Sequence, residues 1–202
     1  GGGKTRLLDE LSLQLPGKVL RLTTTRIHPP QCPCLINPRV SEMRQAFEEE
    51  RVLCADPLPK LYDYLYPGYK PGRILYEPVE YVVAVDVATA GMLGSLEERY
   101  GTMVDLCIDH HPSNSDYAAQ TCLWQEAGAC AEPVAAIIKA IGLPVSGRIA
   151  ECIYTGLATD TGGFRYSNTS AGSMRLAAEI MESGVDTALL NTRIFESESK
   201  AK

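Results

Sequence analysis

The sequence has 202 residues, of which 45% are hydrophobic and 22% charged, so it has the composition of a globular protein and not of a disordered or collagen-like chain. Nineteen Lys and Arg stand against 25 Asp and Glu, and a net charge of -6 excludes an overall cationic surface for long duplex nucleic acid. No apolar run of about 18 residues could span a bilayer, and the first residues lack the apolar region of a signal peptide. We therefore expect a cytoplasmic protein whose seven cysteines are reduced and mostly in the core.

The first part of the chain predicts a mixture of short elements and irregular segments. Leucines recur at helical spacing over residues 7–15, and residues 18–25 alternate as a strand does. Four prolines over residues 28–38 exclude regular structure, and a short charged helix and an apolar strand are expected over residues 41–55. Residues 57–78 contain five prolines and five tyrosines, which predicts a linker or an irregular surface loop.

The second part has a clearer pattern. Residues 81–86 and 104–109 are apolar runs that end in a carboxylate, as buried parallel strands do. Helical periodicity is present over residues 91–100, 132–141, 147–159, 170–183 and 187–195. The alternation predicts an α/β fold with a parallel sheet flanked by helices, and the last 70 residues are expected to be mostly helical.

Polar side chains follow the two apolar runs, where ligands of open parallel sheets bind. Asp86 ends the first run, and Asp109, His110 and His111 end the second. Asp160 is a third candidate because it stands at the expected end of a helix. Imidazole and carboxylate ligands without thiolates suit Mn²⁺, Fe²⁺ or Zn²⁺. Taken alone, Asp86 could instead cap a helix and Asp160 could be a turn residue.

Two glycines follow Asp160 directly. A helix that ends at a metal ligand must turn away at once, and glycine does so with positive φ without a penalty from Cβ. Gly162 and Gly163 are therefore expected in the left-handed region.

These motifs have a familiar order and spacing. Ile-Asp-His-His-Pro-Ser-Asn over residues 108–114, with Thr-Asp-Thr-Gly-Gly-Phe-Arg over residues 159–165, resembles the DHH phosphoesterase family. The resemblance runs from about residue 51 to the end of the sequence. It is strongest to the branch of oligoribonucleases and adenosine-bisphosphate phosphatases, with relatives that act on cyclic dinucleotides.

The resemblance implies a role for each matched residue. Asp86 matches the carboxylate that bridges two metal ions in the family, and His110 and Asp160 match ligands of one Mn²⁺ ion. Asp109 would orient the histidines without itself binding the metal. His111 would contact or polarise the scissile phosphate.

The resemblance also implies an activity and a substrate class. The expected reaction is hydrolysis of short oligoribonucleotides, nucleoside bisphosphates or linear dinucleotides by metal-activated water. Asn114 and Arg165 would contact the phosphate or the nucleotide. No membrane partner is implied, and a homodimer is left open.

Two features of the family's pattern are not found in this sequence. The family begins with a His-x-x-x-Asp-x-Asp segment that supplies most ligands of the second metal, and it continues into a smaller substrate-binding domain. Neither is recognised here, so we expect one metal ion and impaired hydrolysis from this chain as written.

The opening residues indicate a second resemblance. Gly3, Lys4 and Thr5, followed by the leucine-rich stretch, are similar to half of a P-loop. Residues 1–54 resemble the P-loop-like accessory proteins of selenium-dependent hydroxylases. The expected organisation is a partial nucleotide-binding segment over residues 1–54, an irregular linker over 55–80 and a DHH domain over 81–202. A nucleotide-binding accessory protein and an inactive fragment or chimera are the alternatives.

Overall fold

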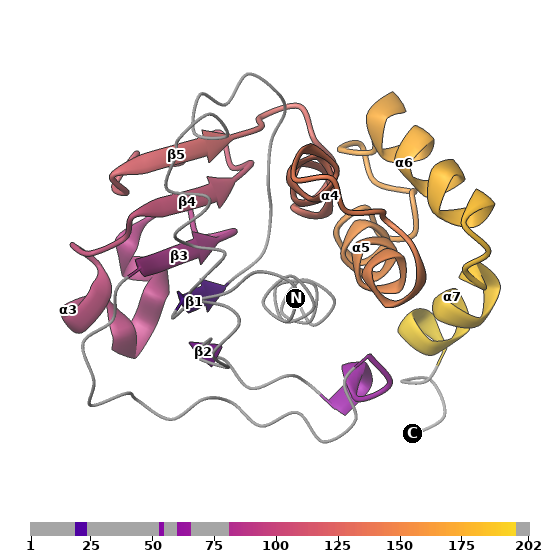
Figure 1. Ribbon diagram of the computed structural model, residues 1–202, viewed down its shortest axis with the longest axis horizontal. Helices are drawn as coiled ribbons and strands as arrows, with labels where there is room; N and C mark the ends of the chain where they lie inside the picture. Colours follow the sequence, from indigo (N-terminus) through magenta and orange to yellow (C-terminus); the bar gives the residue numbers. More distant parts are fainter. Residues whose placement is uncertain (1–18, 24–52, 55–59, 66–80, 197–202) are drawn as a thin grey trace.

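A computed structural model of the chain describes residues 19–23, 53–54, 60–65 and 81–196 (Figure 1). Five parallel strands form one sheet in the order β2-β1-β3-β4-β5. Their bounds are Val19–Thr23 (β1), Leu53–Cys54 (β2), Tyr81–Val85 (β3), Leu106–Asp109 (β4) and Gln120–Leu123 (β5). The expected α/β fold with a parallel sheet flanked by helices is confirmed.

The central strand β3 is buried on both faces, which explains its uninterrupted apolar sequence. Because side chains alternate along a strand, Val83 and Val85 point to one face and Val82 and Ala84 to the other. The first pair packs into a large core formed with the C-terminal helices. The second pair packs into a smaller core with residues of the segment between β3 and β4.

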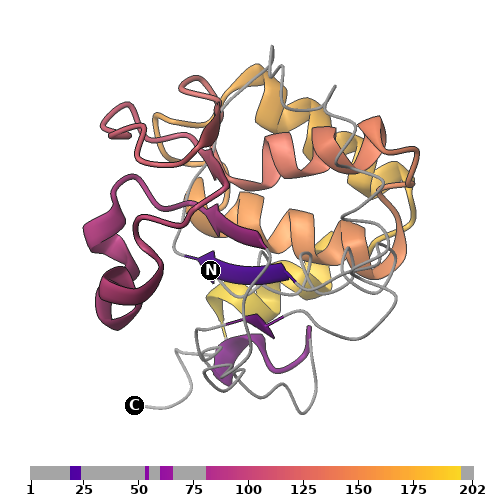
Figure 2. The ribbon, with the colours of Figure 1, turned by 60° about the vertical axis from the view of Figure 1, so that its left-hand side comes forward.

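Helices cover both faces of the sheet. The C-terminal helices are Ala131–Ala140 (α4), Gly147–Asp160 (α5), Ala171–Glu182 (α6) and Thr187–Phe195 (α7). Helices α4 and α5 lie next to one face, and α6 and α7 form an outer layer beyond them (Figure 1). Figure 2 shows the segment between β3 and β4 on the opposite side of the sheet from these helices. None of the described helices is long and apolar enough to cross a membrane.

Capping explains where the last two helices begin. The Ser170 side chain accepts a hydrogen bond from the Ser173 backbone N–H, and Ser173 reciprocates, so a capping box starts α6. The Asp186 carboxylate accepts from the Leu189 N–H at the start of α7. Both starts agree with the sequence pattern to within one residue.

Two elements differ from expectation. Residues 91–100 do not form one helix, because a 3-10 helix, Ala90–Leu96 (η3), is broken at Gly94 (φ 57°) and only Glu97–Tyr100 (α3) is α-helical. Strand β5 was not expected from the sequence. Only Cys122 among its four residues is buried, so this edge strand lacks the apolar run that identifies β3.

Part of the expected linker is ordered against the helical core. Residues Lys60–Tyr62 form a 3-10 helix (η2), and Tyr62 and Leu65 are buried in the large core. The Tyr64 hydroxyl lies 3.1 Å from the Thr155 hydroxyl of α5. Residues 60–65 therefore belong to the same packed unit as the C-terminal helices.

Strands β1 and β2 come from the segment that resembles a P-loop protein, yet β1 pairs with β3 over five residues of the shared sheet. Gly3, Lys4 and Thr5 lie outside the described residues. The nucleotide-binding role of these three residues and the division of the chain at residues 55–80 stay predictions.

Cys107, Cys122, Cys130 and Cys152 are buried and form no disulfide, as expected for reduced core thiols. Burial raises the pKa of the Cys107 thiol to about 12. At pH 8 a thiol with that pKa is ionised to about one part in 10⁴, and only the thiolate reacts with alkylating agents. We expect site-resolved alkylation of Cys107 to be at least about 100-fold slower in the native protein than in urea. Equal alkylation rates in the native protein and in urea would contradict the burial of the Cys107 thiol.

Candidate metal centre

The carboxyl ends of β3 and β4 bring the candidate residues together. Asp86 follows β3 directly, Asp109 is the last residue of β4, and His110 and His111 come next. Parallel strands end at the same edge of a sheet, so sequence positions 86 and 109–111 become neighbours. Asp86 and Asp109 are fully buried, and His110 is 7% exposed.

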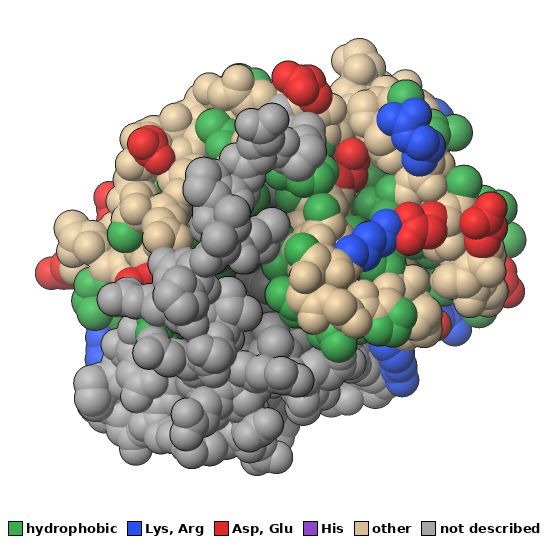
Figure 3. Space-filling view, turned by 45° about the horizontal axis from the view of Figure 1, so that its top comes forward, with side chains coloured by type: hydrophobic (Ala, Val, Ile, Leu, Met, Phe, Trp, Pro, Cys, Tyr) green, Lys and Arg blue, Asp and Glu red, His purple; other side chains and the backbone are tan. Residues whose placement is uncertain are grey.

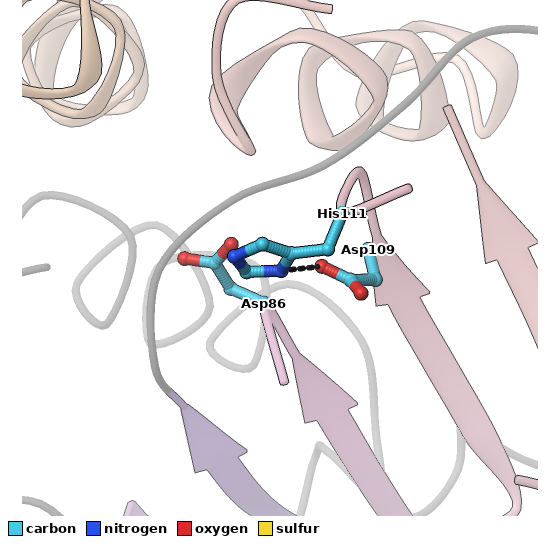
Figure 4. Close-up of side chains that lie close together, drawn as sticks. All are labelled: Asp86, Asp109 and His111. Atoms are coloured by element: carbon cyan, nitrogen blue, oxygen red, sulfur yellow. Dashed lines mark hydrogen bonds and ion pairs between the residues drawn. The ribbon is translucent and has the colours of Figure 1, made fainter. Parts of the chain in front are cut away.

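Asp86, Asp109 and His111 form a group that could hold a metal ion, since their ligand atoms all lie within 4.8 Å of one another. Two ligand atoms on one ion, each about 2.1 Å from it, are at most about 4.2 Å apart, so a small closing movement suffices. Figure 4 shows the His111 ring between the two carboxylates. The donor set of oxygens and imidazole fits a divalent cation such as Mn²⁺.

The backbone of Asp86 is unusual. Its φ is 74°, in the left-handed region, although its N–H still donates to the Ile108 carbonyl across the sheet. A non-glycine residue there costs about 1–3 kcal/mol and is typical of functional sites. This turn out of β3 places a buried carboxylate at the sheet edge.

Asp109 is held from both sides. One of its carboxylate oxygens accepts from His111 Nδ1 at 2.8 Å, and the other accepts from Asn114 Nδ2 at 2.6 Å. The Asn114 carbonyl oxygen in turn accepts from the Asp116 N–H. Both ends of the Asn114 amide are thus engaged within the protein, which indicates that Asn114 orients Asp109 in addition to the substrate contact expected for it.

His110 faces a different neighbour. Its Nδ1 lies 2.7 Å from the Ala127 carbonyl oxygen, which can only accept, so Nδ1 carries the proton. The lone pair of the neutral ring is then on Nε2. Metal-binding histidines commonly have this arrangement, with a backbone carbonyl fixing the tautomer. His110 is outside the three-residue group, and its role as a metal ligand stays a prediction.

Asp160 is the last residue of α5 and is half-buried. An acid at a helix C-terminus is unfavourable to the helix dipole by several tenths of a kcal/mol. Asp160 is also outside the three-residue group, and its ligation stays a prediction. Its backbone carbonyl accepts a hydrogen bond from Asn168 Nδ2 at 3.1 Å.

Arg165 is exposed and bends back on its own loop. Its Nε donates to the Gly162 carbonyl at 2.6 Å, and its guanidinium lies 5.9 Å from the Phe195 ring centre. The remaining guanidinium nitrogens have the donors that a phosphate needs, so the expected substrate contact stays a prediction.

Gly162 and Gly163 have φ of 59° and 70°, so the expected left-handed turn after α5 is confirmed. A Cβ on Gly162 would lie 2.4 Å from the Tyr166 ring. We expect Gly162→Val to displace the end of α5 and to weaken metal binding several-fold without removing a ligand.

The matched control for that substitution is Gly184→Val. Gly184 also has positive φ (87°), but it lies between α6 and α7 with open space around it. Calorimetric titration with Mn²⁺ should separate the two variants. Equal affinities would show that the turn after α5 is only a connection.

Glu132 and Asn168 were missed by sequence reasoning. Glu132 is a buried acid whose Oε1 accepts from the Gly128 N–H at 2.8 Å and from the Ser173 hydroxyl at 2.6 Å. Burial raises its pKa, and these hydrogen bonds oppose the rise. One signal was available: Glu132 is the only polar residue in the otherwise small and apolar stretch 127–135.

No known family profile matches the sequence. The chain is 32% identical over 158 residues to the bifunctional oligoribonuclease and PAP phosphatase NrnA of Thermus thermophilus, covering 74% of this chain and 46% of that protein. It is 25% identical to the protein of the same name from Bacillus subtilis, covering 77% of this chain and 50% of that protein. The chain therefore spans about half the length of the curated relatives it matches.

A solved structure has a similar fold. The crystal structure of an exopolyphosphatase-related protein from Bacteroides fragilis superposes with a TM-score of 0.68 at 19% identity. The match covers 96% of this chain and 62% of that protein. At this low identity the likeness shows a shared fold and no more.

Proposed function

We propose that this chain is a metal-dependent phosphoesterase of the DHH type that hydrolyses short oligoribonucleotides, nucleoside bisphosphates or linear dinucleotides. The observation that carries the proposal is the group of Asp86, Asp109 and His111 at the carboxyl edge of a parallel sheet, in which both carboxylates are buried and His111 is partly exposed. Asp109 and His111, the first and third residues of the Asp-His-His motif, belong to that group. Two NrnA proteins, named as oligoribonucleases and PAP phosphatases, are similar over about three quarters of the chain.

Mn²⁺ is the proposed cofactor. Asp86, His110 and Asp160 would hold it, and Asp109 and His111 lie beside Asp86. A bound divalent cation neutralises phosphate charge and lowers the pKa of water. Oxygen and neutral imidazole donors suit this ion, and none of the buried cysteines of the described part belongs to the group.

His111 is proposed to contact the substrate, and its hydrogen bond to Asp109 would orient the ring for that contact. The carboxylate holds the ring and fixes the proton on Nδ1, as second-sphere acids do for catalytic histidines. His111 is about 15% exposed whereas Asp109 is fully buried, so the histidine is the member of the pair that can meet substrate. Arg165 would add a charged donor to a phosphate oxygen from the loop after α5.

The charge balance favours a short substrate over a long one, since 19 Lys and Arg stand against 25 Asp and Glu. On the one face drawn in Figure 3, the Lys and Arg side chains of the described residues are scattered between acidic and neutral ones. A long nucleic acid would need a continuous row of such cations to displace its counterions. Recognition would instead depend on a few groups close to the metal.

The test is hydrolysis of a labelled diribonucleotide and of adenosine 3′,5′-bisphosphate by the purified chain with Mn²⁺. Turnover should require the metal, should disappear with EDTA and should fall at least about 100-fold in His110→Ala. Turnover that persists equally in EDTA and in the variant would contradict the proposal, and so would the absence of both turnover and Mn²⁺ binding.

A further inference from the structure

The Ala127 carbonyl that holds His110 is part of a peptide group with a second anchor. The Ala127 C=O and the Gly128 N–H belong to the same planar unit, so fixing one end fixes the other. His110 Nδ1 lies 2.7 Å from the oxygen, and the Gly128 N–H donates to Glu132 Oε1 at 2.8 Å. The peptide plane thus joins a buried carboxylate to the histidine ring.

Glu132 is itself fixed by two helices. It lies in the first turn of α4, and its Oε1 also accepts from the Ser173 hydroxyl of α6 at 2.6 Å. Ser173 is fully buried and is part of the capping box that starts α6. A carboxylate held by these donors polarises the peptide it binds, which strengthens the carbonyl at the far end as an acceptor.

Asn168 holds the next carbonyl along the chain. Its Nδ2 donates to the Gly128 oxygen at 2.9 Å and to the Asp160 oxygen at 3.1 Å. One amide therefore connects the segment behind His110 to the end of α5 that bears Asp160. The two residues expected as ligands of the same ion share this support.

Close packing leaves no room for a side chain at position 128. A Cβ on Gly128 would lie 2.6 Å from the Ser173 hydroxyl and 2.8 Å from the Asn168 carbonyl oxygen. Contacts this short do not occur between real side chains and backbone atoms, so only glycine fits here without displacing the loop.

We propose that Glu132 and Asn168 are positioning residues that hold the two peptide groups on either side of Gly128, so that the Ala127 carbonyl fixes the tautomer and the ring orientation of His110. The inference rests on the proposed function in one respect, namely that His110 serves the metal site. Neither residue would touch the metal or the substrate. Loss of either should leave all ligands in the sequence but free the ring to change its tautomer.

Two variants remove the support and one retains it. Glu132→Ala removes the acceptor from the Gly128 N–H, and Asn168→Ala removes the donor to the Gly128 carbonyl. Glu132→Gln keeps an oxygen that can accept from Gly128 and Ser173, and its amide nitrogen cannot accept from the Ala129 N–H that also bonds the carboxylate. We expect this variant to keep the wild-type tautomer of His110. Glu179→Ala and Asn191→Ala are matched controls, because Glu179 pairs with Lys139 on the surface and Asn191 binds the Tyr154 hydroxyl.

The first measurement is ¹⁵N NMR of the histidine rings in metal-free protein, which reports the tautomer directly. Wild type, Glu132→Gln and the controls should show His110 with its proton on Nδ1. Glu132→Ala and Asn168→Ala should show an average of tautomers. If the folded alanine variants keep the wild-type tautomer, the inference is overturned. Should Glu132→Ala fail to fold, the exposed position of Asn168 makes Asn168→Ala decisive by itself.

The second measurement is Mn²⁺ affinity by calorimetry. Loss of a residue that orients a metal-binding histidine typically lowers the metal affinity by 10–100-fold. We expect the Mn²⁺ affinity of Asn168→Ala to fall by about 10-fold. Glu132→Gln should stay within about threefold of wild type; a loss equal to that of Glu132→Ala would overturn the hydrogen-bond argument. An averaged tautomer with unchanged affinity would support the positioning role and contradict metal ligation by His110.

Discussion

Asp86→Asn is expected to abolish Mn²⁺-dependent hydrolysis of a short phosphoester, lowering turnover at least about 10³-fold, because it removes a charge from the centre of the site. Asn has nearly the same size and adopts positive φ readily, so the backbone at φ 74° should be retained. The loss would therefore come from the carboxylate and not from the fold.

The same substitution should stabilise the metal-free protein. Asp86 and Asp109 are both fully buried within one cluster, and like charges at close range in a desolvated site repel each other. We expect the Tm of metal-free Asp86→Asn to exceed that of wild type, while the rise in Tm on adding Mn²⁺ disappears.

Asp116→Asn is the matched control for both measurements. Asp116 is also a non-glycine residue with positive φ (54°), but it is exposed and its carboxylate accepts from the Thr121 hydroxyl. It should keep both the turnover and the Mn²⁺-induced rise in Tm. A similar loss in the two variants would mean that the backbone at these turns matters and the Asp86 charge does not.

How well the sequence predicted each element depended on how many of its residues are buried. Helix α7 was predicted with its observed bounds, because its N-cap Asp186 and the buried Leu190 and Ile194 mark it in the pattern. Strand β5 was missed because its single buried side chain gives no alternation to detect. The prolines around residues 60–65 predict a linker or an irregular surface loop, whereas Tyr62 and Leu65 pack into the core.

The sequence predicts the position of the site but not the hydrogen bonds that hold its residues in place. Asp86 and Asp109 end apolar runs, and that position alone identifies the carboxyl edge of a parallel sheet. The hydrogen bond from His110 to Ala127 spans 17 residues, and that from Asn168 to Gly128 spans 40. Such pairings depend on how α4, α5 and α6 pack together, which no local spacing encodes.

The two adjacent histidines should separate metal binding from turnover. Their Nδ1 atoms bond to different partners: His110 to a backbone carbonyl and His111 to the Asp109 carboxylate. The ring centroids are 5.5 Å apart and the ring planes differ by 71°. With different partners behind them, we expect one ring to bind the metal and its neighbour to meet the phosphate.

We expect His110→Ala to lower the affinity for Mn²⁺ at least about 10-fold and to lose turnover as a result. His111→Ala should bind Mn²⁺ within a few-fold of wild type but lower kcat about 10²–10³-fold, the typical effect of removing one group that stabilises transition-state charge. Saturating the His110 variant with Mn²⁺ should restore part of its rate, whereas added metal should not help the His111 variant. If His111→Ala instead loses Mn²⁺ affinity and His110→Ala loses only kcat, His111 is the metal ligand, as its position beside Asp86 allows. His110 would then contact the phosphate.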